Sequence, residues 1–215
     1  MSTLLLRLAG PMQAWGAEAQ FEIRKTNREP TKSGVIGLLA AALGLRRDAP
    51  LTALAQLRFG VRVDREGVLL RDFHMARGKK DAYVTTRYYL CDAVFLVGVS
   101  SEDEALMQQL AEAVACPAFP LFLGRRSCPP EGRVCLGLRT LPLEEALRCE
   151  PPLVQPGRHS PGQARMILDA PDGLARVRDV PVSFSPYHRQ YAFRAAREGW
   201  QDLSAGEHDP MQELR

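Results

Sequence analysis

The chain has 215 residues, of which 46% are hydrophobic and 25% are charged, and its formal net charge is +3. This composition is typical of a soluble globular protein with a sizeable core, in one large domain or two small ones. No segment has the roughly 20 apolar residues that a membrane span needs, and Arg7 interrupts the apolar run near the N-terminus. We therefore expect neither a membrane span nor a signal peptide, and a cytoplasmic location.

The first 128 residues alternate between strand and helix patterns. In chain order we expect a strand at 3–8, a loop at 10–30, a helix at 33–43, a short helix at 51–58, strands at 59–65, 68–73, 86–90 and 93–99, a helix ending near 115, and a strand at 119–123. Ser33 or Thr31 can cap the first long helix, and Ser101 with Glu104 has the spacing of a capping box for the second.

This order is βαββαβ, which predicts an α+β protein with a ferredoxin-like (RRM-like) domain at 1–128. An excursion at about 72–90 is inserted between its second and third strands. Residues 129–215 are richer in proline and glycine, with short β-like pieces at 133–138, 164–169 and 174–179. We expect them to form a small β-rich C-terminal region packed on the first domain.

The sequence offers no metal, disulfide or cofactor motif. Its five cysteines are odd in number, none is spaced as CxxC, and none has a histidine nearby in a zinc-like pattern. The common nucleophile, zinc-protease, P-loop and dinucleotide motifs are also missing. We therefore expect neither a metal nor a cofactor.

Three stretches combine cations with aromatic or small residues, as nucleic-acid interfaces do. Residues 10–34 end at a helix N-terminus, which favours phosphate; the excursion interleaves cations with Phe73, Tyr83, Tyr88 and Tyr89; and LGRRSC has a glycine that allows close approach to a ligand. The candidate RNA-binding residues are Gln13, Trp15, Arg24, Lys25, Arg28, Lys32, Ser33, His74, Arg77, Lys79, Lys80, Arg87, Gly124, Arg125, Arg126 and Ser127. The alternatives are a solvated loop with a capped helix, an exposed hairpin and a plain turn.

A catalytic hypothesis rests on His74. With Lys79 and Tyr83 close in sequence, His74 could take the proton of an RNA 2′-hydroxyl while the cation stabilises the phosphorane, without a metal. The alternative is a surface histidine at a strand end.

Four segments in order, RLAGPMQAWG, PTKSGVIGLLAAALGL, LLRDFH and LGRRSCPP, resemble the CasD family of Cascade subunits. Cascade is the type I-E CRISPR surveillance complex, and CasD belongs to the repeat-associated, ferredoxin-like superfamily of CRISPR proteins. The resemblance runs from Leu4 to about Pro130. It implies a ferredoxin-like domain whose excursion at 72–90 is a protruding β-hairpin thumb, shorter here than is usual in the family.

The resemblance also implies a non-catalytic role in antiviral defence. Such subunits hold the 5′ handle of the CRISPR RNA and cap the filament of CasC backbone subunits. They contact the large CasA subunit and meet target DNA indirectly. Their thumb displaces one nucleotide of the guide. Arg125 and Arg126 would grip the handle, the cations of 24–33 would form the opposite wall, and the cations of the excursion would line the thumb. In type I-C relatives the corresponding protein is itself the processing ribonuclease, so the hypothesis on His74 stays open.

Overall fold

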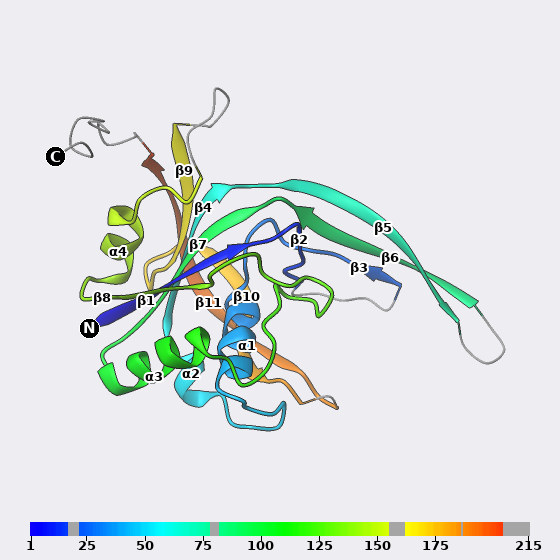
Figure 1. The fold of residues 1–215 in the computed structure, drawn as a ribbon, viewed down its shortest axis with the longest axis horizontal. Helices are drawn as coiled ribbons and strands as arrows, with labels where there is room; N and C mark the ends of the chain where they lie inside the picture. Colours follow the sequence, from blue (N-terminus) through cyan, green and yellow to red (C-terminus); the bar gives the residue numbers. More distant parts are fainter. Residues whose placement is uncertain (17–21, 78–81, 155–161, 186, 204–215) are drawn as a thin grey trace.

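The protein is described by a computed structural model that covers residues 1–16, 22–77, 82–154, 162–185 and 187–203 (Figure 1). It has a mixed α+β structure of two mostly antiparallel sheets and a few helices. The strands are β1 Ser2–Ala9, β2 Met12–Gln13, β3 Ile23–Arg24, β4 Arg58–Arg65, β5 Val68–Arg77, β6 Ala82–Cys91, β7 Val94–Ser101, β8 Cys135–Arg139, β9 Gln163–Asp169, β10 Ala175–Ser183 and β11 Gln190–Asp202. The helices are α1 Lys32–Ala42, α2 Thr52–Ala55, α3 Glu104–Ala115 and α4 Leu143–Cys149.

The larger sheet has the strand order β10-β11-β9-β4-β7-β1-β8, and its neighbours pair antiparallel. Helix α1 connects β1 to β4, and α3 connects β7 to β8. Strands β9, β10 and β11 extend this same sheet beyond β4, where Gly60 lies opposite Leu168. The expected boundary between residues 128 and 129 therefore does not coincide with a break between sheets.

The strand expected at 119–123 is wrong, because β8 supplies the pairing to β1 instead. The backbone N–H groups of Ala118 and Phe119 donate to carbonyls at the end of α1, at 2.9 and 3.2 Å. Pro120 has no N–H to give to a sheet. The segment is thus held against α1 and leads into a loop.

The caps of the two long helices differ from the expectation in one case. Thr31, one of the two candidates, caps α1 by accepting a hydrogen bond from the Gly34 N–H at 3.2 Å. At α3 the cap is Asp103, whose carboxylate accepts from the Leu106 N–H at 2.9 Å, and Ser101 accepts from the Asp103 N–H. The prediction that Ser101 caps this helix is therefore wrong by two residues, since the cap is Asp103 and the helix begins at Glu104.

Helices cover both faces of the larger sheet. Side chains from β1, β4 and β7 alternate between a large core shared with α1, α2 and α3 and a smaller core under α4. Leu4 and Leu6 belong to the first core, and Leu5 between them belongs to the second. In the described part of the chain, none of these helices reaches the length and apolarity that a membrane span requires.

The smaller sheet is the β5–β6 hairpin, with β2 and β3 added along the other edge of β6. The hairpin extends as a long curved arm away from the helices (Figure 1). Its ten register pairs run from Val68 opposite Cys91 to Arg77 opposite Ala82. The excursion expected at 72–90 is thus the outer part of this hairpin.

A fully buried ion pair holds α4 on its face of the sheet. The Arg62 Nε and Nη2 atoms donate to the two carboxylate oxygens of Asp64 at 2.7 and 2.9 Å. Arg62 Nη1 donates to the carbonyls of Leu147 and Glu150 at 2.6 Å, and Nη2 also donates to the carbonyl of Pro151 at 2.9 Å. The guanidinium of Arg62 thus bonds both to Asp64 on β4 and to carbonyls at the end of α4, and these bonds offset the cost of burying its charge.

We predict that Asp64→Ala lowers the free energy of unfolding by about 3–5 kcal/mol, because it leaves the Arg62 charge buried without its partner. The matched control is Arg148→Ala, which removes an exposed i,i+4 pair with Glu144 and should cost about 1 kcal/mol or less. Urea unfolding followed by circular dichroism measures both. Equal midpoints for the two variants would contradict the assignment.

Candidate nucleic-acid interface

The site begins with a tight loop at residues 123–128, which we call the Gly124 loop. Gly124 has a φ of +82°, and a Cβ atom at this position would lie 1.8 Å from the carbonyl oxygen of Ala14. The Ala14 N–H donates to the Leu123 carbonyl at 3.1 Å, and the Leu123 N–H donates to the Cys128 carbonyl at 2.7 Å. Only glycine combines this conformation with this closeness, so the loop is fixed against the segment after β1.

Arg125 joins this loop to the smaller sheet. Its Nη2 atom donates to the Arg24 carbonyl on β3 at 2.8 Å, and its guanidinium carbon lies 4.6 Å from the centre of the Tyr89 ring on β6. Arg125 is half-buried, whereas Arg126 and Ser127 are exposed. The two adjacent arginines therefore differ: Arg125 positions the loop, and Arg126 projects into solvent.

Tyr89 is buried beneath these cations. Burial by itself raises the pKa of its phenol, but side-chain hydrogen bonding and charge from Arg125, with contributions from Ser127 and Arg87, outweigh it. The net result is a pKa below the usual value of 10.0. The phenol thus reports the positive potential of the surface around it.

Two guanidinium nitrogens at this junction are buried and lack a hydrogen-bond partner among the described residues, namely Arg87 Nε and Arg125 Nη1. Parallel pairing of β3 with β6 places Arg24 beside Arg87, and Lys25 follows as an exposed residue. The side chains of Arg87 and Arg125 both approach the Tyr89 phenol, so the junction concentrates guanidinium donors around one ring. We call this set the arginine junction: Arg24, Lys25, Arg87, Arg125 and Arg126.

Gln13 and Trp15, both candidate RNA-binding residues, lie in the core instead. Gln13 is fully buried; its Nε2 donates to the Ala93 carbonyl at 2.7 Å, and its Oε1 accepts from Trp15 Nε1 at 3.0 Å. The Trp15 ring packs against the start of α1 at Gly34. Their polar groups bond to each other and to the backbone, and so hold the N-terminal loop in place.

The expected phosphate site at the start of α1 is occupied by the chain itself. The Lys32 N–H donates to Asp179 Oδ2 at 2.8 Å, and Lys32 Nζ pairs with Asp169 Oδ2 at 2.9 Å. Arg194 bridges the same two carboxylates. Burial lowers the pKa of its guanidinium, but the two carboxylates outweigh burial, so the pKa is raised. Lys32 and Ser33 are therefore buried structural residues, and Asp169, Asp179 and Arg194 were missed because they lie more than a hundred residues away along the chain.

The remaining candidates lie on the rim or on the hairpin. Arg28 is exposed in the segment after β3, and His74 and Arg77 are exposed on β5. The register places Tyr83 on the same hairpin face as His74, one diagonal position away. Lys79 and Lys80 fall outside the described residues. In the described part of the chain, no three His, Cys, Asp or Glu side chains group as metal ligands.

Comparisons with known proteins identify the family. The model of the CRISPR-associated protein (Cas_Cas5) family matches residues 3–197, so the chain belongs to this family. It is 42% identical over 159 residues to the CRISPR system Cascade subunit CasD of Escherichia coli (strain K12), which covers 63% of this chain and 70% of that protein. The resemblance seen in the four sequence segments is thereby confirmed.

Two solved structures are similar over nearly the whole chain. One, described as a crystal structure of a Cas protein, is 43% identical with a TM-score of 0.77, covering 94% of this chain and 95% of its own. The other, a chain of a CRISPR RNA-guided surveillance complex, is 34% identical with a TM-score of 0.80, covering 99% and 97%. The similarity includes residues 129–215, where the sequence segments gave no specific match.

We predict that Gly124→Ala lowers the free energy of unfolding by at least about 2 kcal/mol, because a left-handed alanine costs about 1–2 kcal/mol before its clash with Ala14 is counted. Gly199→Ala is the control, since nothing lies within 4 Å of an added Cβ there; it should change stability by about 0.5 kcal/mol or less. Thermal unfolding compares them. Equal melting temperatures would show that the loop does not need this contact.

We predict that Arg125→Ala raises the pKa of Tyr89, because the hydrogen bond and the charge of Arg125 no longer oppose the effect of burial on the phenol. In the unsubstituted protein the lowered pKa of the phenol stabilises the folded state fully above the ordinary pKa of the phenol, and this contribution is lost as the pH falls through the folded value. It is absent at neutral pH. Ultraviolet difference titration against a Tyr89→Phe reference measures the shift, and an unchanged titration would remove Arg125 from contact with the phenol.

Proposed function

We propose that the chain is a non-catalytic CRISPR RNA-binding subunit of a Cascade-type antiviral surveillance complex, and that the arginine junction grips the 5′ handle of the CRISPR RNA. The observation that carries the proposal is the convergence of five cations from the β3 segment, β6 and the Gly124 loop at one junction, where Arg24, Lys25 and Arg126 are exposed. Phosphate oxygens are the acceptors that guanidinium groups bind most readily, often bidentately. Arg126 and Lys25, exposed at the rim, add charge along the same path.

The fold supports the same role. The strand order β8-β1-β7-β4, with α1 and α3 as its connections, supports the ferredoxin-like domain that we propose, and the β5–β6 hairpin is the proposed thumb. Exposed side chains on one face of this hairpin, including His74 and Tyr83, suit a single strand of RNA. His74 and Arg77 would lie along the guide as it leaves the junction.

The likeness to CasD and to a chain of a surveillance complex supports the partners of this proposal. They are the CRISPR RNA, a CasC-like backbone subunit next to the hairpin and a CasA-like large subunit, with target DNA met through the complex. The hairpin carries exposed apolar side chains on one face, among them Phe73, Met75 and Val84. Such a face needs a partner to cover it.

We predict that the double variant Lys25→Ala, Arg126→Ala binds handle RNA at least about tenfold more weakly, and that its log–log salt slope is flatter by about 1.4, because two phosphate contacts on a single strand are lost. The control is Arg46→Ala with Arg47→Ala, an exposed arginine pair on the loop after α1. Fluorescence anisotropy with 5′-handle RNA and a scrambled RNA, across a salt series, measures both. Equal losses in the two double variants would contradict the site.

The same mixtures, with full repeat RNA in EDTA, test the non-catalytic part of the proposal. We expect no specific cleavage. Specific cutting of the repeat that disappears in His74→Ala would overturn it and assign the metal-independent ribonuclease, with His74 as base and Tyr83 or Lys79 assisting.

A further inference from the structure

A second cationic surface lies on the opposite side of the larger sheet from the Gly124 loop. Helix α4 packs on β1, β4 and β7, and the same sheet face continues over β11 and β10 beyond the helix. Its exposed side chains form what we call the arginine face: Arg58, Arg176, Arg178, Phe193 and Arg197. The Gly124 loop packs instead into the core on the side of α1, so the two surfaces are separate.

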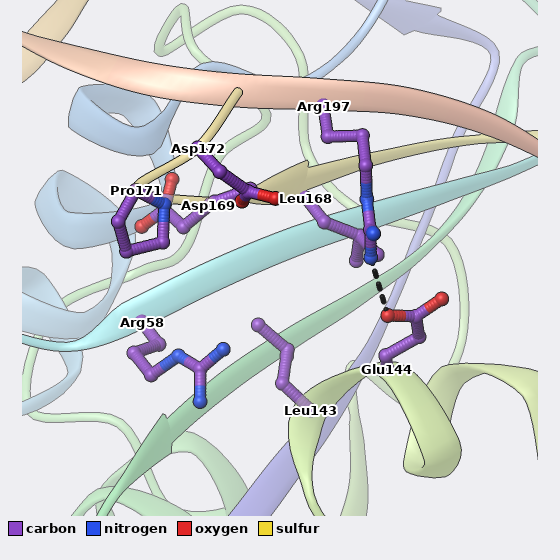
Figure 2. A pocket seen from close by; sticks show the side chains of 9 residues that line it. Arg58, Leu143, Glu144, Leu168, Asp169, Pro171, Asp172 and Arg197 are labelled. Carbon is purple, nitrogen blue, oxygen red and sulfur yellow. Dashed lines mark hydrogen bonds and ion pairs between the residues drawn. The ribbon is translucent and has the colours of Figure 1, made fainter.

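The strand register places these side chains on one face. Ala196 and Arg194 of β11 point to the α1 side, where Arg194 lies over Phe59. The alternate residues Phe193 and Arg197 therefore point to the α4 side, and Arg197 donates to Glu144 of α4 at 2.7 Å. Figure 2 shows this pair and the Arg58 side chain around one small pocket.

Cross-strand pairing extends the face to the edge of the sheet. On β10, Arg178 is directly opposite Phe193, and Arg176 is opposite Ala195. The guanidinium of Arg178 lies 6.0 Å from the centre of the Phe193 ring, and that ring is 63% exposed.

The charge of the face is positive over β10 and compensated near α4, where Arg197 pairs with Glu144. Arg58 and Arg176 have no ion-pair partner among the described residues. Glu144, Asp169 and Asp172 line the pocket with Arg58 and Arg197, and Asp169 is already paired with Lys32 and Arg194. Phe193 is largely exposed, and among the described residues only the guanidinium of Arg178 lies over its ring. A ligand that fits both the arginines and the exposed ring is a polyanion that also carries exposed planar groups able to stack.

We propose that the arginine face binds single-stranded nucleic acid, with Phe193 stacking on a base and Arg176 and Arg178 contacting the flanking phosphates. An exposed ring on an open sheet is a stacking platform for unpaired bases. A duplex would present only its backbone and leave the ring unused. An acidic peptide would match the charge but not the stacking.

The test uses the full chain carrying Lys25→Ala and Arg126→Ala, so that binding at the arginine junction is suppressed. The probe is a fluorescein-labelled polyuridine of about 12 nucleotides, followed by anisotropy. Phe193→Ala should weaken binding about tenfold, and Arg176→Ala with Arg178→Ala should flatten the salt slope by about 1.4. The matched control is Trp200→Ala, because Trp200 is an aromatic of 59% exposure on the other face of the same strand.

Three outcomes would overturn the proposal: equal losses for Phe193→Ala and Trp200→Ala, tighter binding of a duplex of the same length, or displacement of the probe by polyglutamate as readily as by unlabelled polyuridine. The proposal does not depend on the arginine junction. The two surfaces are separate if the double variant Lys25→Ala, Arg126→Ala loses handle binding but still binds polyuridine. The double variant Arg176→Ala, Arg178→Ala should show the reverse, with weaker polyuridine binding and unchanged handle binding.

Discussion

The candidate RNA site depends on one close contact, in which the backbone of Gly124 lies against the carbonyl of Ala14 with no room for a Cβ atom. This contact fixes the Gly124 loop to the segment that follows β1. It thereby brings Arg125 over the Tyr89 ring and against the Arg24 carbonyl. Because β3 and β6 already hold the Arg125 side chain, it loses little conformational freedom when a ligand binds, which is the advantage of a preorganised site.

Buried ion networks divide the cations of this chain into two groups. Lys32, Arg62 and Arg194 are neutralised by carboxylates inside the protein and serve the fold. The cations of the arginine junction and the arginine face have few or no acidic partners and stay at the surface. A net charge of only +3 therefore understates the positive potential of these two surfaces, because the compensated arginines contribute little to it.

Local signals in the sequence predicted much of the framework. The apolar run of α1 with its Thr31 cap, the buried strand β7 and the hairpin excursion were all visible as periodicity or capping patterns. The partner of Lys32 was not visible, since Asp179 is 147 residues away and only sheet topology brings them together. For the same reason a basic residue at a helix N-terminus looked like a phosphate ligand, and Gln13 and Trp15 looked like surface groups. The glycine and paired arginines of the loop were identified, but their different roles became clear only from the position of Tyr89.

The most direct test of the account is to map where the RNA handle touches the chain. Handle RNA carrying 4-thiouridine would be photo-crosslinked to the full chain, and the modified peptides identified by mass spectrometry. The account predicts crosslinks within residues 22–28, 86–89 and 123–128, which the fold brings together at the arginine junction. Crosslinks that avoid all three segments, or that are unchanged in Lys25→Ala, Arg126→Ala, would contradict it.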